Sequence, residues 1–203
     1  MHIPDGFLTP TVTLTTVTVS GIVLANSLKK VNAAMKPEQI PLMGLLASFV
    51  FLIQLFSFPI IGGTSIHLTG ALLISILLGP RSGFIILSVS LLALAILFQH
   101  GGIFSLGANI LNMAGVGCFL AYWIYKAIPG KRVSIIIASV LASIISAFLV
   151  ALELGVSDMF EFSTGFKSMS LIYGITGMIE GVVTLLILDF IRRIKPELLE
   201  MAK

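Results

Sequence analysis

Seven long apolar segments follow one another along the chain and constrain its fold more than any other feature. They run over residues 9–28, 40–60, 64–78, 82–98, 103–127, 133–154 and 168–192. Only 10% of the 203 residues are charged, against about 25% in a soluble domain. Most side chains therefore do not face water, and a chain in lipid must satisfy its backbone within helices. We expect an all-α integral membrane protein, a single domain over residues 1–203, with seven transmembrane helices.

Basic residues lie in alternate connections between these segments. The connections on one side carry Lys29, Lys30, Lys36, Arg81, Lys126, Lys131, Arg132, Arg192, Arg193, Lys195 and Lys203. The connections on the other side carry one, Lys167. Because Lys and Arg favour cytoplasmic loops, this pattern predicts a cytoplasmic C-terminus and an N-terminus outside the cell. The net charge of +3 is too small to indicate nucleic acid as a partner.

The three histidines, His2, His67 and His100, all fall on the predicted outer side. From His67 to Arg81 there are too few residues to cross a hydrocarbon core of about 30 Å at about 1.5 Å per residue. We therefore expect His67 to lie inside the bundle. The polar GGTS stretch before it, which includes Ser65, would then be a re-entrant loop that protein surrounds.

The first two residues of the chain can chelate a metal ion. His2 is a large second residue, so Met1 should be retained with a free amine. That amine and the amide nitrogen of His2 close a five-membered ring around a metal, and the same amide and the His2 Nδ1 close a six-membered ring. Such a planar nitrogen set suits Ni²⁺ and Cu²⁺. A fourth nitrogen must come from His67 or His100, so we expect residues 1–8 to insert into the bundle.

A few other polar residues stand within apolar segments. Asn109 and Asn112 lie three apart on one face of a helix, and Glu180 lies deep in the last segment. Each could orient a metal ligand or join helices to one another, as could Ser65. The single cysteine, Cys118, excludes an intrachain disulfide and a cysteine-rich metal site.

Four stretches of the sequence resemble the CbiM/NikM family, the substrate-capturing membrane components of energy-coupling factor importers for cobalt and nickel. They are MHIPDGFL, GGTSIHLTGALL, LLGPRSG and FQHGGIFSLGANILNM, and the resemblance covers the whole chain. It implies that Met1, His2 and His67 bind the metal. The MHIPDGF start is more similar to nickel members than to the MHIMEGY start of cobalt members. The resemblance therefore favours Ni²⁺ as the transported substrate, with Co²⁺ as the alternative.

The resemblance also implies partners and a location. They are a transmembrane coupling subunit, a cytoplasmic ATPase pair and a small accessory membrane protein, in the cell membrane of a prokaryote. The sequence has no GxxxxGK[ST] phosphate loop, so we expect a transport component that is not itself an enzyme. His100 stands where many relatives carry an acid, and its role as an alternative ligand stays open. A zinc-dependent intramembrane enzyme using His67, His100 and Glu180 and a stand-alone channel are the alternatives from other classes.

Overall fold

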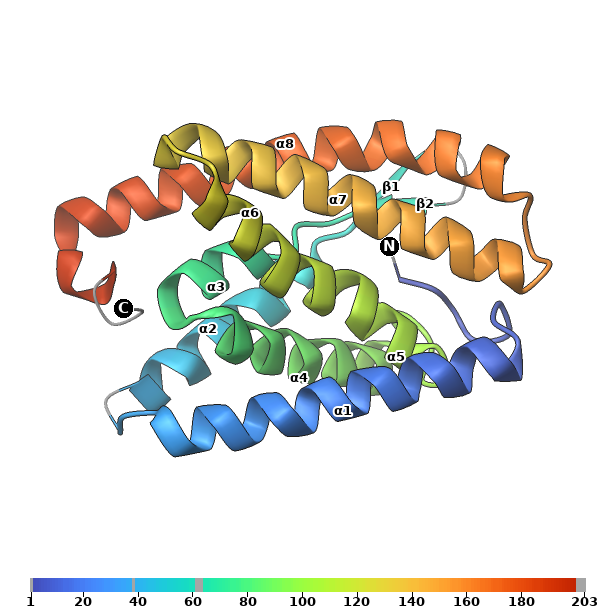
Figure 1. The fold of residues 1–203 in the computed structure, drawn as a ribbon, viewed down its shortest axis with the longest axis horizontal. Helices are drawn as coiled ribbons and strands as arrows, with labels where there is room; N and C mark the ends of the chain where they lie inside the picture. The colour runs from blue at the N-terminus through green and yellow to red at the C-terminus, as the bar shows by residue number, and fades with distance from the viewer. Residues whose placement is uncertain (1, 38, 61–63, 200–203) are drawn as a thin grey trace.

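The chain forms a bundle of helices whose axes run roughly along one direction (Figure 1). The computed structural model describes residues 2–37, 39–60 and 64–199, with the backbone alone for 58–60 and 64–66. The elements are α1 (Pro10–Ala34), α2 (Gln39–Leu55), β1 (Phe58–Ile60), β2 (Thr64–Ile66), α3 (Ala71–Leu78), α4 (Pro80–Phe98), α5 (Leu106–Asn109), the π-helix η1 (Ile110–Leu120), α6 (Ala121–Ala127), α7 (Lys131–Val156), α8 (Phe162–Ile194) and the 3₁₀ helix η2 (Pro196–Leu199). The described residues are thus mainly helical, as predicted, with one small hairpin.

Five helices of the described chain are long and apolar enough to cross a membrane. They are α1, α4, the continuous helix over 106–127, α7 and α8. The first segment, TVTLTTVTVS, alternates like a strand but is helical from Pro10, which suits the first position of a helix. The last helix begins at Phe162, six residues before the predicted start. Its extra turn follows Glu161, whose carboxylate accepts hydrogen bonds from the Ser163 and Thr164 hydroxyls.

The second and third predicted segments differ most from expectation. The second stops being a helix at Leu55, and β1 continues it; the third begins as β2 and is helical only in α3. The two strands pair antiparallel, with Pro59 opposite Ser65. The eight residues of α3 span about 12 Å at 1.5 Å per residue, so α3 alone cannot cross a bilayer. Backbone pairing and the left-handed Gly70 (φ 67°) before α3 interrupt the helix that apolarity alone predicted.

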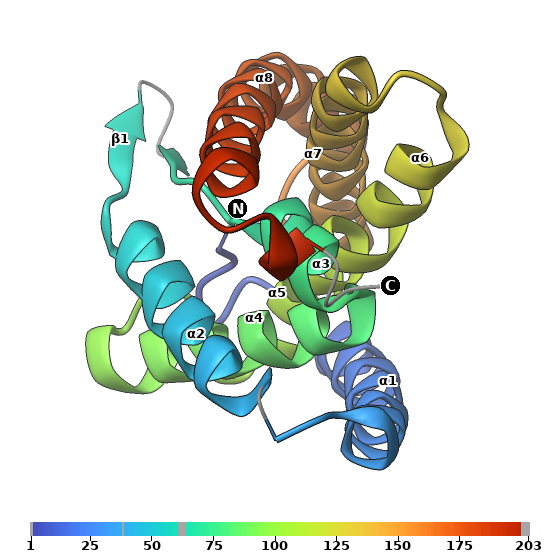
Figure 2. The ribbon, with the colours of Figure 1, turned by 90° about the vertical axis from the view of Figure 1, so that its left-hand side faces the viewer.

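The short helix α3 lies near the middle of the bundle when it is viewed end-on, whereas α1 lies at the periphery (Figure 2). Burial agrees with this arrangement. The buried residues of α3 are Ala71, Leu72, Leu73, Ile74, Ser75 and Leu77, whereas those of α1 are Thr16, Ser20 and Ser27. Because α3 is enclosed on nearly all sides, the residues that lead into it, including His67, lie inside the bundle.

The two longest helices, α7 and α8, pack closely together. A Cβ atom at Gly177 would lie 2.7 Å from the Ser139 carbonyl oxygen, and one at Gly181 would lie 2.9 Å from the Ile136 Cα. Small residues let two helix backbones approach in this way inside a membrane. This contact places the inward-facing serines of α7 opposite the polar residues of α8.

Candidate metal centre

The N-terminal tail runs from the start of α1 back toward the middle of the bundle (Figure 1). Its anchor is Ile3, which is 2% exposed. The Ile3 N–H donates to Asn109 Oδ1 at 2.8 Å. The Ile3 carbonyl accepts from Asn109 Nδ2 at 3.1 Å, from the Gly102 N–H at 3.0 Å and from the Ser105 hydroxyl. These hydrogen bonds fix the backbone immediately after His2.

Asp5 makes a second attachment between the tail and the same loop. Its carboxylate accepts hydrogen bonds from the N–H groups of Ile103 at 3.0 Å, Phe104 at 2.8 Å and Ser105 at 3.2 Å. These donors precede α5, where backbone N–H groups lack partners within the helix. A Cβ atom at Gly102 would overlap Asp5. The loop therefore needs glycine there for the tail to dock.

The three histidines, which are far apart in the sequence, come together next to this tail. The ring centroids of His2 and His67 are 4.7 Å apart, with the rings stacked. The His100 ring is 4.3 Å from His2 and 6.1 Å from His67. His67 is buried, whereas His2 and His100 are only partly buried. The Nε2 atoms of His2 and His67 are both buried, so this pair forms the inner part of the cluster, and His100 contacts it chiefly through His2.

Both inner imidazoles carry a buried nitrogen, Nε2, that has no hydrogen-bond partner in the described part of the chain. His67 Nδ1 lies 3.4 Å from the Leu68 carbonyl oxygen. A proton on Nδ1 would therefore point at this oxygen and leave the Nε2 lone pair for a metal. Burial lowers the pKa of His2 well below 6.5, and the neighbouring His67 lowers this pKa further. Burial also lowers the pKa of His100. Both rings are thus held neutral, which is the form that binds metals.

Glu180, on α8, supports the His67 segment without touching the histidines. Its carboxyl group accepts hydrogen bonds from the Thr69 hydroxyl and, at 3.3 Å, from the Thr69 N–H. The Thr69 hydroxyl oxygen in turn accepts the Ala71 N–H at 3.2 Å. Glu180 thus caps the start of α3 from another helix, where a carboxyl group stabilises both the free N–H groups and the helix dipole.

The remaining predicted residues divide into those that meet the tail and those that do not. Asn109 holds Ile3 directly, whereas Asn112 donates to Glu153 Oε2 at 2.6 Å and does not contact the tail in the described structure. Met1 and the Ser65 side chain lie outside the described residues. Their predicted roles therefore stay predictions.

Several residues of the centre's surroundings were missed at the level of sequence. Glu153 is an acid inside an apolar segment, which is the same signal that drew attention to Glu180. Asp5, Thr69 and Ser105 carry no distinctive local pattern. Their partners are about 100 residues away, so only the fold reveals them.

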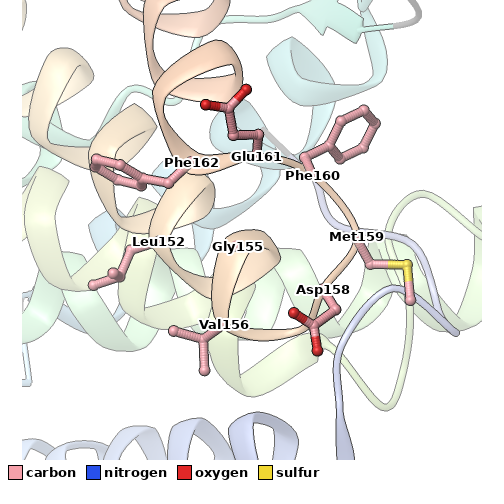
Figure 3. Close-up of a pocket in the computed structure, with 8 residues that line it drawn as sticks. All are labelled: Leu152, Gly155, Val156, Asp158, Met159, Phe160, Glu161 and Phe162. Atoms are coloured by element: carbon pink, nitrogen blue, oxygen red, sulfur yellow. The ribbon is translucent and has the colours of Figure 1, made fainter.

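A separate surface hollow lies at the turn between α7 and α8, and Figure 3 shows the eight residues that line it. Of the described lining residues, none belongs to the predicted site. The carboxyl groups of Asp158 and Glu161 point apart in this view (Figure 3), and Glu161 is engaged with Ser163 and Thr164. The hollow therefore lacks a convergent set of metal donors among these residues.

The bundle and its histidine cluster define a multi-pass membrane protein with a candidate site for a transition metal. A family model described as "Cobalt uptake substrate-specific transmembrane region" matches residues 2–198. The chain therefore belongs to the CbiM family, which confirms the resemblance found in its motifs.

Relatives of known name fall on both sides of the nickel–cobalt distinction. The fused nickel transport protein NikMN of Rhodobacter capsulatus is 36% identical, over 98% of this chain and 64% of its own length. The probable fused nickel transport protein LarMN of Lactiplantibacillus plantarum is 33% identical, over 97% of this chain and 66% of its own length. The cobalt transport protein CbiM of Clostridium tetani is 29% identical, over 95% of this chain and 85% of its own length. The chain thus spans about two thirds of the length of these fused nickel relatives.

A solved structure described as a truncated transition metal transporter has the same fold. It superimposes with a TM-score of 0.89 at 31% sequence identity, covering 95% of this chain and 99% of that one. Fold, family and relatives agree on a transmembrane component of nickel or cobalt transport.

Proposed function

We propose that this chain captures Ni²⁺ for import, in a plane of four nitrogens. The donors are the Met1 amine, the His2 amide, the His2 Nδ1 and the His67 Nε2. The observation that carries the proposal is the buried His67 Nε2, which has no hydrogen-bond partner among the described residues and whose ring stacks 4.7 Å from that of His2. A buried nitrogen without a hydrogen bond costs about 1–3 kcal/mol, and a bound metal would remove that cost.

Backbone donors are necessary in this proposal. No group of three His, Cys, Asp or Glu side chains within the described ranges is placed to hold a metal ion. Glu180, which a zinc enzyme would use with His67 and His100, is instead bonded to Thr69. The docked tail supplies what side chains do not, because the anchoring of Ile3 holds the His2 amide beside the cluster.

The preference for Ni²⁺ over Co²⁺ follows from donor geometry. Four nitrogens in a plane, one of them a deprotonated amide, favour ions with a tetragonal preference, and Ni²⁺ has it. Co²⁺ is the alternative substrate, and cobalt proteins among the relatives make the comparison of the two ions part of the test.

We infer seven transmembrane segments, with the N-terminus outside and the C-terminus in the cytoplasm. Two of the segments, α2 and α3, would each cross only part of the bilayer and meet at the hairpin β1–β2. The tail, the loop around Gly102 and the turn at Ser157 are bonded together at one end of the bundle. The last residues of α8 lie toward the opposite end (Figure 1), where Lys30 and Arg81 line a shared surface hollow. The positive-inside rule assigns that basic end to the cytoplasm.

Release of the ion would need partners. We propose that a transmembrane coupling subunit and a cytoplasmic ATPase pair drive it, with a small accessory membrane protein, in a prokaryotic cell membrane. In this arrangement the chain itself binds the metal but does not hydrolyse ATP.

Metal binding by the purified full chain tests the proposal. We expect one Ni²⁺ per chain, the absorption spectrum of a square-planar ion, and tighter retention of Ni²⁺ than of Co²⁺ in competition. His67→Ala should abolish the planar spectrum, because it removes one of the four donors. Tighter retention of Co²⁺ would reassign the substrate, and a planar spectrum that survives in His67→Ala would contradict the donor set.

A further inference from the structure

A small polar cavity lies inside the bundle, between α3, η1, α7 and α8. Its polar lining consists of Thr69, Ser139, Ser143, Ser146 and Glu180. The volume is about 20 Å³, which is room for one water molecule or one bare metal ion. From Ser146 to Ser139 the hydroxyls step along α7 toward its first residue, Lys131, and therefore away from the N-terminal tail.

Two of these lining groups point to a ligand. Ser139 is 4% exposed, and its hydroxyl has no hydrogen-bond partner in the described structure. Glu180 is 7% exposed, and the two ion pairs found among the described residues both involve Asp189 and not Glu180. A carboxyl group within a membrane-spanning helix is costly and usually marks an ion or proton pathway. The cavity thus contains a carboxyl group that has no basic partner in the described chain, and a hydroxyl group that makes no hydrogen bond there.

Thr69 connects this cavity to the histidine cluster. It lies two residues after His67, lines the cavity, and donates both its hydroxyl and its N–H to Glu180. A shift of residues 67–69 away from α8 would break these two bonds. The same shift would withdraw the His67 nitrogen from a metal. The cavity is already present while these bonds are intact, and each Glu180 oxygen keeps a further lone pair for a cation.

We propose that the cavity is a second divalent-cation site, built from oxygen donors, that receives the metal as it leaves the nitrogen site. This proposal rests on the proposed function of the nitrogen site. One carboxyl group and a few hydroxyls bind transition metals more weakly than a planar nitrogen set does, and weak binding is what a site of passage requires. Thr184, one turn beyond Glu180 on α8 and 2% exposed, continues the polar path.

Manganese provides a probe, because Mn²⁺ prefers oxygen donors and square-planar Ni²⁺ is diamagnetic. The full chain is first saturated with Ni²⁺ and then titrated with Mn²⁺ while free Mn²⁺ is followed by electron paramagnetic resonance. We expect one Mn²⁺ per Ni²⁺-loaded chain. Glu180→Gln, which removes the charge but keeps an oxygen acceptor for Thr69, should abolish Mn²⁺ binding. Ser139→Ala should weaken it by about fivefold, the effect of losing one neutral donor.

Matched variants separate this effect from a general loss of structure. Ser88→Ala removes a buried hydroxyl that bonds only its own helix, at the Phe84 carbonyl. Glu153→Gln alters an intramembrane carboxyl group that bonds Asn112 and does not line the cavity. Both should bind Mn²⁺ as the unaltered chain does. A Ni²⁺-loaded chain without bound Mn²⁺, or Mn²⁺ binding unchanged in Glu180→Gln, would overturn the second site alone. A chain that binds no Ni²⁺ would contradict both proposals.

Discussion

The two inner histidines reach the same place by different structural means. His2 belongs to a terminal tail held at one end of the bundle, mainly by hydrogen bonds to the backbone of Ile3 and to the side chain of Asp5. His67 precedes the buried helix α3, and Glu180 of α8 caps the start of that helix. The tail is attached to one loop and the helix that follows it, whereas the His67 segment is joined to the core and to the last long helix.

This difference indicates which of the two segments can move independently of the bundle. Undocking the tail breaks a few hydrogen bonds and uncovers little apolar surface, since Ile3 is the buried apolar residue of the tail. Displacing His67 requires α3 or α8 to shift, because the His67 segment leads into α3 and is bonded to α8. In the proposed function, a change that a partner imposes on α8 would thereby reach the metal. We therefore interpret the tail as the segment that closes over an arriving ion, and the His67 segment as the one whose movement releases it.

Releasing the tail should have the largest effect among variants that leave every ligand in place. Asn109→Leu removes two hydrogen bonds to Ile3 and leaves the Ile3 N–H buried without its acceptor. We expect Ni²⁺ affinity to fall by about 100-fold, the upper range for loss of a residue that orients a ligand. Equilibrium titration checks this, and Asn112→Leu, equally buried but bonded to Glu153, is the matched control. Equal losses in both variants would refute the anchoring role of Asn109.

Removing the cap of α3 should have a smaller effect. Glu180→Leu leaves the Thr69 N–H and hydroxyl without their acceptor, but the buried side chains of α3 still hold the helix. We expect about a tenfold faster dissociation of Ni²⁺, the lower range for an orienting residue, measured by transfer to a chelator. Glu180→Gln should restore most of the retention. If the glutamine variant is as fast as the leucine variant, hydrogen bonding to Thr69 is not the cause.

Loss of the outer histidine should change equilibrium binding least. His100 is partly exposed and contacts the pair mainly through the ring of His2. We expect His100→Ala to alter the free energy of Ni²⁺ binding by no more than about 0.5 kcal/mol, the range of ordinary surface substitutions. Calorimetry against the unaltered chain measures this. A loss as large as that of His67→Ala would make His100 the fourth ligand instead.

The length of the apolar segments predicted the long helices well, because a segment that must bury its backbone in lipid has almost no alternative to a helix. It failed at residues 56–60 and 64–70, where pairing of β1 with β2 and a left-handed Gly70 break an apolar run. The argument from the short distance between His67 and Arg81 did place His67 inside the bundle, since it used the thickness of the membrane and not local pattern.

The polar contacts around the centre could not be predicted in the same way. The Ile3–Asn109 and Thr69–Glu180 bonds join residues 106 and 111 positions apart, and no local spacing encodes them. The sequence marked Asn109 and Glu180 as unusual but could not say which partner each one holds. Ser139 gives no distinctive signal, because serine is common in such segments, and Glu153 differs from Glu180 in lying near the end of its helix.

The free N-terminal amine offers the most direct test of the whole account. The full chain is prepared in two forms, one that begins at Met1 and one with a single added glycine before it, and both are titrated with Ni²⁺. A chelate formed by Met1 and His2 predicts a square-planar spectrum in the first form. In the second form we expect loss of that spectrum and an affinity reduced by more than the roughly 10–100-fold expected for an orienting residue. Equal affinity and identical spectra in the two forms would contradict the chelate at Met1 and His2.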